Sequence, residues 1–402
     1  MFKKYLLGIL VVILVVVTGI IFYGLHPSKK TIYLNNAQNK SVAQDDKNKE
    51  NNEALSGEKD FFISGWLPYW SREGGVDSLS GNLSIFEEIN PFAFGVREDG
   101  SLEDTANIKN SSWVRLKQEA QREKVEIIPT ILWTDEMAMH QIFSDTQKLQ
   151  KHIEAISAML AENNFSGVDI DYEGKDMVDR DLFSAFLKAL SQRLKVEGKT
   201  ISCTVEARTE DNPPIDWTGT QAMSFANDFL VLNEVCDSVR IMAYDQVFQT
   251  NGMKKSFNDP SEIPSAPNAD IRWVESVMRY GMQYIDSEKL VLGVPTYGWE
   301  FGLEKTSTGY HYTRVKSVSY PEAVDKANKN NVVIERSLGG EPFFIYPSTD
   351  GKHIVTFSDS QSVKQKIELA KQLNLKGISF FKIDGLNDPN LFEIIAEEIK
   401  NN

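Results

Sequence analysis

Residues 167–173 read Gly-Val-Asp-Ile-Asp-Tyr-Glu, and this stretch gives the clearest indication of the fold. Valine, isoleucine and tyrosine favour a β-strand, in which successive side chains point to opposite faces. Asp169, Asp171 and Glu173 therefore share one face, with neighbouring Cβ atoms about 7 Å apart. The opposite face is apolar, and a helical segment precedes the strand. This arrangement predicts a parallel strand covered by helices.

The three carboxylates on this face indicate acid chemistry. Like charges in a sheltered site resist simultaneous ionisation, so at least one of the three should keep its proton near neutral pH. A retained proton is what a general acid needs. The alternatives are a solvated strand face and a metal site. None of the five histidines lies close in sequence, so we expect no metal ion and predict a catalytic strand.

The composition is that of a globular protein with a substantial core. The chain has 402 residues, of which 41% are hydrophobic and 25% are charged. Its net charge of -14 argues against a nucleic-acid partner, because no basic stripe offsets the acidity. The two cysteines, Cys203 and Cys236, are too few for a disulfide framework. They either pair or lie apart as buried apolar residues, and the sequence leaves both possibilities open.

The N-terminus differs from the rest of the chain. Residues 5–25 form an apolar run of 21 residues without a charge, preceded by two lysines. About 20 residues suffice to cross a bilayer, so we predict an uncleaved membrane anchor over residues 1–27, with the following domain outside the cell. Residues 28–59 are polar and have the composition of a flexible linker. The folded domain is expected to cover residues 60–402.

Short β-branched or aromatic runs alternate with amphipathic stretches such as 145–162 and 181–195. The candidate strands are 61–67, 91–96, 125–132, 167–172, 200–206, 238–244, 289–294 and 377–383. Eight strands joined mainly by helices predict an α/β fold, a (β/α)8 barrel. Residues from about 296 to 376 are expected to form a small α+β insertion between strands seven and eight, with a hairpin of 342–346 and 353–357.

Catalytic groups of such barrels lie at the C-terminal ends of the strands. The residues found there in this chain are Trp66, Trp133, Glu173, Glu206, Tyr244, Asp245, Tyr297 and Asp384. Carboxylates, tyrosines and tryptophans that converge are typical of a cleft that binds sugars. Tyr69 belongs to a proline-broken aromatic cluster that cannot all pack inward. We therefore expect ligand contacts from Trp66, Tyr69, Trp133, Glu206 and Tyr297.

Three motifs in order along the chain resemble glycoside hydrolase family 18, the chitinase-like enzymes. The family pattern Asp-Gly-x-Asp-x-Asp-x-Glu is matched by residues 166–173 at every position except Ser166. Met-Ala-Tyr-Asp at residues 242–245 is similar to the family's sixth-strand motif. Gly-Val-Pro-Thr-Tyr-Gly at residues 293–298 is similar to its seventh-strand motif.

The resemblance implies a role for each residue of the motifs. Glu173 would protonate the leaving glycosidic oxygen and then activate water. The substrate's own acetamido oxygen would attack the anomeric carbon, so that neither a protein nucleophile nor a cofactor is needed. Asp171 would hold the acetamido N–H, and Asp169 would share a proton with Asp171. Tyr244 would orient the acetamido oxygen, while Asp245 would bind the same sugar.

The chain departs from the family pattern at the eighth strand, where Phe381 replaces the tryptophan that floors the central sugar site. Phenylalanine can still stack on a sugar, with less area and no indole N–H. The short insertion and its hairpin resemble the bacterial cell-wall and spore-associated branch. This implies a monomeric N-acetylglucosaminidase acting on peptidoglycan, with chitin oligosaccharides as the second candidate. A catalytically inactive glycan-binding protein is the alternative of a different class.

Overall fold

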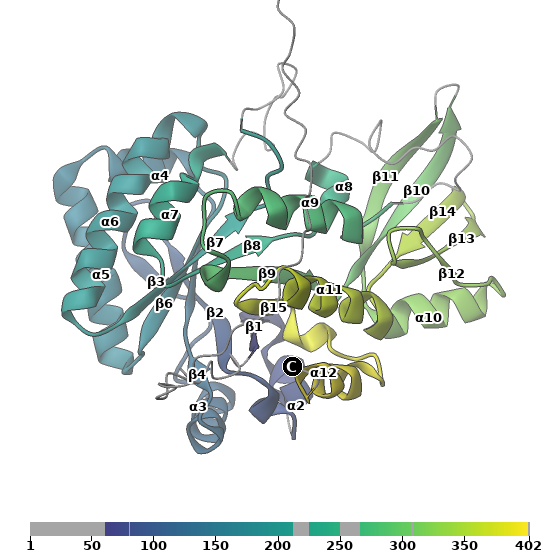
Figure 1. Cartoon of the computed structure of the whole chain (residues 1–402), viewed down its shortest axis with the longest axis horizontal. Helices are drawn as coiled ribbons and strands as arrows, with labels where there is room; N and C mark the ends of the chain where they lie inside the picture. The colour runs from purple at the N-terminus through teal and green to yellow at the C-terminus, as the bar shows by residue number, and fades with distance from the viewer. Residues whose placement is uncertain (1–60, 80, 212–224, 250–265, 307–308, 401–402) are drawn as a thin grey trace, which may run out of the picture. The chain divides into compact units, whose positions relative to one another are not determined.

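The computed structural model describes residues 61–79, 81–211, 225–249, 266–306 and 309–400. Within this part of the chain, parallel strands form a closed barrel that helices surround (Figure 1), which confirms the predicted (β/α)8 barrel. Its eight strands are β1 (Phe62–Pro68), β2 (Glu88–Val96), β5 (Thr130–Trp133), β6 (Gly167–Tyr172), β7 (Thr200–Glu206), β8 (Ser238–Met242), β9 (Leu290–Pro295) and β15 (Gly377–Phe381).

The barrel closes where the last strand meets the first. β1 pairs in parallel with β15 on one side and with β2 on the other. The remaining neighbours follow chain order, because each helical crossover returns the chain beside the strand it has just left. The carboxyl ends of all eight strands therefore meet at one end of the barrel.

Two predicted strands differ most from those observed, while the other bounds agree within two residues. The predicted strand 125–132 is divided into β4 (Glu126–Ile127) and β5, and Pro129 between them has no N–H to donate to a ladder. β2 begins at Glu88, three residues before the predicted start. This start was not predicted because Glu88 and Asn90 are polar, and polar side chains are unusual in a buried strand.

Helices cover the outside of the barrel, and most of them begin at an Asp or Asn whose side chain caps the first turn. They are α2 (Arg72–Leu79), α3 (Ser111–Glu123), α4 (Glu136–Phe143), α5 (Thr146–Asn163), α6 (Arg180–Val196), α7 (Phe229–Val235), α9 (Ile271–Gly281), α11 (Ser360–Gln372) and α12 (Leu391–Lys400), whereas the short α8 (Gln246–Gln249) packs against the insertion. Their apolar faces and the outward side chains of the strands form the main hydrophobic core.

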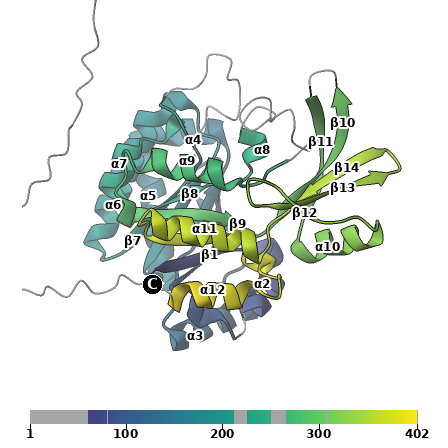
Figure 2. The same cartoon turned by 45° about the vertical axis from the view of Figure 1, so that its right-hand side comes forward.

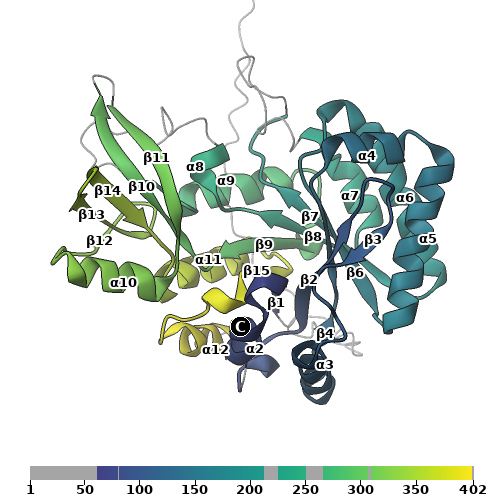
Figure 3. The same cartoon turned by 180° about the vertical axis from the view of Figure 1, so that it is seen from behind.

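The insertion follows β9 and lies at one side of the barrel (Figures 2 and 3). It is a five-stranded antiparallel sheet in the order β11-β10-β14-β13-β12. Its elements are β10 (Gly298–Thr306), β11 (Gly309–Val318), α10 (Tyr320–Lys329), β12 (Glu335–Arg336), β13 (Pro342–Ser348) and β14 (Gly351–Thr356). The predicted end near residue 376 is too late, because α11 packs against β9 and β15 as a barrel helix.

The two cysteines form a disulfide, which decides between the possibilities that the sequence left open. Cys203 in β7 bonds to Cys236 at the end of α7, with an S–S distance of 2.02 Å. Both residues are buried among the apolar side chains between sheet and helices.

No helix of the described residues is long and apolar enough to cross a membrane. The predicted anchor at residues 1–27 and the predicted linker at residues 28–59 lie outside those residues.

Candidate active site

The three carboxylates of the central motif are carried by β6 and the residue that follows it. Asp169 and Asp171 are at most 1% exposed, while Glu173 at the carboxyl end of the strand is half-buried. Tyr172 points to the opposite side, where its ring stacks on Phe186 of α6. The alternation predicted from the sequence therefore separates an inner acidic face from an outer apolar face.

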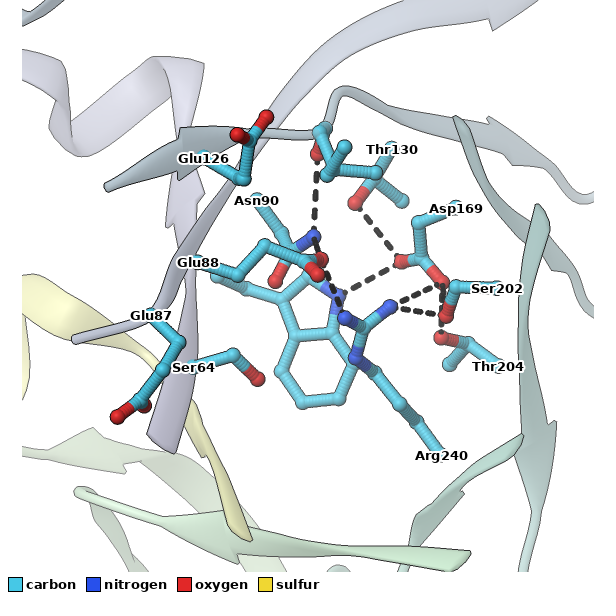
Figure 4. A network of polar contacts seen from close by, with 12 residues as sticks. Ser64, Glu87, Glu88, Asn90, Glu126, Thr130, Asp169, Ser202, Thr204 and Arg240 are labelled. Carbon is cyan, nitrogen blue, oxygen red and sulfur yellow. Dashed lines mark hydrogen bonds and ion pairs between the residues drawn. The ribbon is translucent and has the colours of Figure 1, made fainter. Parts of the chain in front are cut away.

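Asp169 lies at the centre of a polar network inside the barrel (Figure 4). Both of its oxygens accept hydrogen bonds, at 2.9–3.0 Å, from residues of β1, β5, β7 and β8. The donors are the indole of Trp66, the hydroxyls of Thr130, Ser202 and Thr204, and the guanidinium of Arg240. Asp169 thus joins four strands across the barrel interior.

Arg240 supplies the positive charge of this network. Its side chain is 0% exposed, and Nη1 lies 2.9 Å from Oδ1 of Asp169 while Nη2 contacts Oε1 of Glu88. Burial alone would lower the pKa of Arg240. The charges of Glu88 and Asp169, together with their hydrogen bonds, outweigh this effect, so the pKa of Arg240 is raised. Arg240 and Glu88 were not predicted as site residues, although a charged residue within a buried strand indicates that a partner of opposite charge lies nearby.

Burial favours the protonated forms of Asp171 and Glu173. Burial, and then the charges of Glu173, Asp169 and Glu206, raise the pKa of Asp171 well above its ordinary value. Burial is also the largest cause for Glu173, whose pKa rises to about 7 with help from Glu206. The sharing of a proton between Asp169 and Asp171, which the resemblance implies, stays a prediction.

Tyr244 faces these carboxyl groups from the end of β8. Burial, followed by the charges of Asp171 and Glu173, raises the pKa of Tyr244 well above its ordinary value, so its hydroxyl keeps the proton. Its ring stacks on Phe381 with the centroids 5.5 Å apart and the planes 11° from parallel. A Cβ at Gly293 would lie 3.1 Å from Cε1 of Tyr244 and 2.6 Å from the carbonyl oxygen of Ile241, which explains the glycine of that motif.

Asp245 follows in the left-handed region, with φ of 56°. Its Oδ1 accepts hydrogen bonds from the hydroxyl of Tyr297 at 2.6 Å and from the indole of Trp299 at 2.8 Å. Its backbone N–H donates to Oδ1 of Asn268 at 3.0 Å. This conformation is uncommon for residues other than glycine, and three hydrogen bonds hold Asp245 in it here.

Two residues that the sequence analysis missed support Asp245 from behind. Asn268 is buried and also donates from its amide to the carbonyl of Tyr297 at 3.0 Å. Glu341, a buried residue of the insertion, accepts the backbone N–H groups of Asn268 at 2.9 Å and of Ala269 at 3.0 Å. The insertion therefore positions the loop that holds Asp245.

Aromatic side chains lead from Phe381 to the surface. Phe92 contacts Phe381 with the ring centroids 6.0 Å apart, and Trp70 contacts Phe92 at 6.1 Å. Tyr69 packs edge-on against Trp70 at 5.0 Å. Tyr69 and Trp70 are 41% and 56% exposed, so these two rings can stack on a sugar.

Two predicted ligand contacts lie elsewhere. Trp66 is 1% exposed and its indole N–H is already used by Asp169, so it packs inside the barrel. Trp133 is 2% exposed and pairs in register with Tyr172, whose ring it meets at 5.3 Å on the outer, helix-facing side of β6. Neither position supports the predicted contact with a sugar.

The arrangement brings together proton donors and a hydrogen-bond acceptor. Glu173 can donate a proton, and Oδ1 of Asp171 accepts no hydrogen bond from the described part of the chain. In that same part, His, Cys, Asp and Glu side chains form no group of three or more that could hold a metal ion. The raised pKa of Glu173 and the oxygen of Asp171 that has no partner among the described residues equip the site for acid–base chemistry on a polar substrate.

Comparison with known proteins agrees with this geometry. The family model described as Glycosyl hydrolases family 18 matches residues 69–385. The chain belongs to this family. The family motifs predicted from the sequence thus lie on the expected barrel strands, at their carboxyl ends.

Several bacterial proteins are similar to this family member. The chain is 22% identical over 245 residues to the uncharacterized glycosylase YvbX of Bacillus subtilis, covering 60% of this chain and 64% of the relative. It is 27% identical over 237 residues to the cortical fragment-lytic enzyme of the same organism, covering 58% and 50%. The chain thus spans between half and two thirds of the length of these curated relatives.

A solved structure shows the same fold. The spore cortex-lytic enzyme SleL of Bacillus megaterium QM B1551 superposes with a TM-score of 0.68 at 22% identity, covering 85% of this chain and 75% of that chain.

Replacing Arg240 tests the central network. Arg240→Met should lower the free energy of unfolding by about 3–5 kcal/mol, because Asp169 and Glu88 lose their buried counter-charge. Denaturant unfolding of the purified protein measures this. The control Arg279→Met removes an exposed pair with Glu275 and should cost no more than about 1 kcal/mol. Equal effects of the two substitutions would contradict the structural role of the ion pair.

Proposed function

We propose that the protein is a glycoside hydrolase that cleaves β-1,4 bonds next to N-acetylglucosamine by substrate-assisted, retaining catalysis. The observation that carries this proposal is the position of Glu173 at the carboxyl end of β6, on the same face as the buried carboxyl group of Asp171, where burial raises the pKa of Glu173 to about 7. An acid with such a pKa is protonated near neutral pH and still releases its proton to a leaving group. Membership in glycosyl hydrolase family 18 supports the assignment of this proton to a glycosidic oxygen.

In the proposed first step, Glu173 gives its proton to the glycosidic oxygen as the bond to the anomeric carbon breaks. The acetamido oxygen of the substrate attacks that carbon and closes a cyclic intermediate. Asp171 accepts the acetamido N–H and, once the proton that it shares with Asp169 has moved to Asp169, stabilises the positive charge of the ring as a carboxylate. Tyr244 donates its hydroxyl to the acetamido oxygen before the attack and so orients it.

In the second step, the carboxylate of Glu173 removes a proton from water, which attacks the anomeric carbon from the side that the leaving group vacated. The cyclic intermediate opens, the acetamido group is restored, and Glu173 regains its proton. Asp245 binds a hydroxyl of the same sugar, and Phe381 with Tyr244 offers a stacked aromatic floor.

Neutralising Glu173 tests the mechanism. Glu173→Gln should reduce kcat by at least about 100-fold, since the amide of glutamine cannot give the proton to the leaving oxygen. In the unchanged protein, kcat/KM should fall as pH rises through about 7, the pKa of Glu173, because only the protonated form is active. Initial rates measure the loss of kcat, and their dependence on pH measures the fall of kcat/KM. Glu234→Gln, which changes an exposed residue of α7, is the control and should keep the activity of the unchanged protein. Full activity of Glu173→Gln would refute the proposed mechanism.

We propose peptidoglycan as the substrate polymer, with chitin oligosaccharides as the second candidate. Similarity to a protein named as a cortical fragment-lytic enzyme supports a wall polymer. The exposed pair Tyr69 and Trp70 supports a polymer over a single sugar, because rings beyond the central site can hold further units.

Product analysis decides between the two substrates. The purified protein is incubated with peptidoglycan and with chitin oligosaccharides, and new reducing ends are identified by mass spectrometry. Fragments that end in N-acetylglucosamine should appear from peptidoglycan. Turnover of chitin alone would assign the second candidate, while binding of both polymers without turnover would favour a glycan-binding protein.

We also propose that residues 1–27 anchor the protein in the cell membrane with the barrel outside. The uncharged apolar run at residues 5–25 supports an anchor. The disulfide between Cys203 and Cys236 supports an external domain, because such bonds form and persist mainly in oxidising surroundings.

Cell fractionation tests the anchor. The full chain should remain in the membrane fraction after alkaline extraction, and protease added to intact cells should degrade the barrel. Removing residues 1–27 should release the domain from membranes. A cytoplasmic protein that resists the added protease serves as the control. Recovery of the full chain in the soluble fraction would contradict the proposal.

A further inference from the structure

Two polar contacts hold the residues that follow Glu173. Gly174 has a φ of 75°, a conformation that glycine adopts readily, and its N–H donates to Oε1 of Glu206 at 3.4 Å. The next side chain, that of Lys175, turns back and donates from Nζ to the carbonyl oxygen of Tyr172. The backbone is therefore held on both sides of Glu173, by one cation and one anion.

Lys175 is buried, with 1% of its side chain exposed. Its Nζ lies 4.6 Å from the centroid of the Phe183 ring and 3.9 Å from Oε1 of Glu206. A buried ammonium group is costly unless it is paired, and a longer-range ion pair, one carbonyl and one aromatic face meet that requirement here.

Glu206 reaches this place from the carboxyl end of β7. Its Oε2 accepts a hydrogen bond from the amide of Asn227 at 2.6 Å, and its side chain is 16% exposed. With Gly174 and Lys175 at its other oxygen, Glu206 is committed to the loop after β6. This geometry explains Glu206 better than the sugar contact predicted from the sequence does.

We propose that Lys175 and Glu206 act as a pair of positioning residues that set the upper pH limit of the reaction, because they hold the backbone of Glu173 and place opposite charges beside its carboxyl group. This inference rests on the proposed role of Glu173 as the acid. Neither residue needs to touch the substrate.

The electrostatic surroundings of Glu173 agree with opposite effects of the two charges. The titratable groups that interact with it are Asp171 on β6, Glu206 on β7, Tyr244 and Asp245 after β8, Tyr297 after β9, and Lys175. Burial and then Glu206 raise the pKa of Glu173, Lys175 lowers it, and Asp245 raises it. Lys175 is the cation among these six groups, so removing it and removing Glu206 should move the titration of Glu173 in opposite directions.

The test compares pH profiles of the whole protein carrying Lys175→Met, Glu206→Gln or both. The measured quantity is kcat/KM on whichever polymer the unchanged protein cleaves, because its alkaline limb reports the acid of the free enzyme. Lys175→Met should move this limb upward by about 0.5 pH unit or more, and Glu206→Gln should move it downward by a similar amount. The double substitution should return it towards the original position.

The controls separate charge from packing. Lys175→Arg keeps the positive charge and should leave the limb in place, whereas a purely structural lysine would not require a charge. Lys188→Met and Glu234→Gln remove the members of an exposed pair on α6 and α7 and should leave the profile unchanged. Thermal melting of each variant confirms that the profile refers to folded protein.

Failure of the proposed function can be told apart from failure of the proposed role of Lys175 and Glu206. If Glu173→Gln keeps its activity, the proposed function fails. If Glu173→Gln is inactive while the folded single variants shift the limb in the same direction or leave it in place, only the role of Lys175 and Glu206 is overturned.

Discussion

The guanidinium of Arg240 balances two carboxylates in the interior of the barrel, and the active strand depends on this balance. Asp169 could not remain buried at the centre of β6 without a cation and further donors, because an isolated charge in a protein interior is very costly. Once Asp169 is satisfied, the remaining acidic residues of the strand lack such compensation. Burial and neighbouring charges raise the pKa of Asp171 and of Glu173, which favours the protonated forms from which the proposed chemistry starts.

The site thus divides three similar side chains by their surroundings alone. Asp169 accepts five donors, Asp171 has an oxygen without a partner in the described part of the chain, and Glu173 lies at the open end of the strand. Tyr244 and Asp245, which follow β8, complete the site. The proposed proton donor, acceptor and sugar floor are all carried by the barrel strands or by residues directly after them.

Local patterns in the sequence predicted the barrel and the acidic strand, because alternation within β6 needs no knowledge of distant residues. Long-range partners could not be predicted in the same way. Glu341 and Asn268 are 73 residues apart and meet only because the insertion folds back on the barrel. The pairing of the cysteines has the same origin. Trp133 lies on the outer face because position at a strand end does not state which face a side chain occupies, whereas Trp66 faces inward but its indole N–H is used by Asp169.

The contact of Glu341 with the loop at Asn268 changes how the accessory sheet should be regarded. A peripheral subdomain is often treated as a detachable module that can be trimmed or exchanged between homologues. Here one of its buried carboxylates belongs to the scaffold of the catalytic mouth. A chimaera that receives a foreign sheet without an acidic residue at this position would inherit a loosened Asp245, even with every motif residue intact.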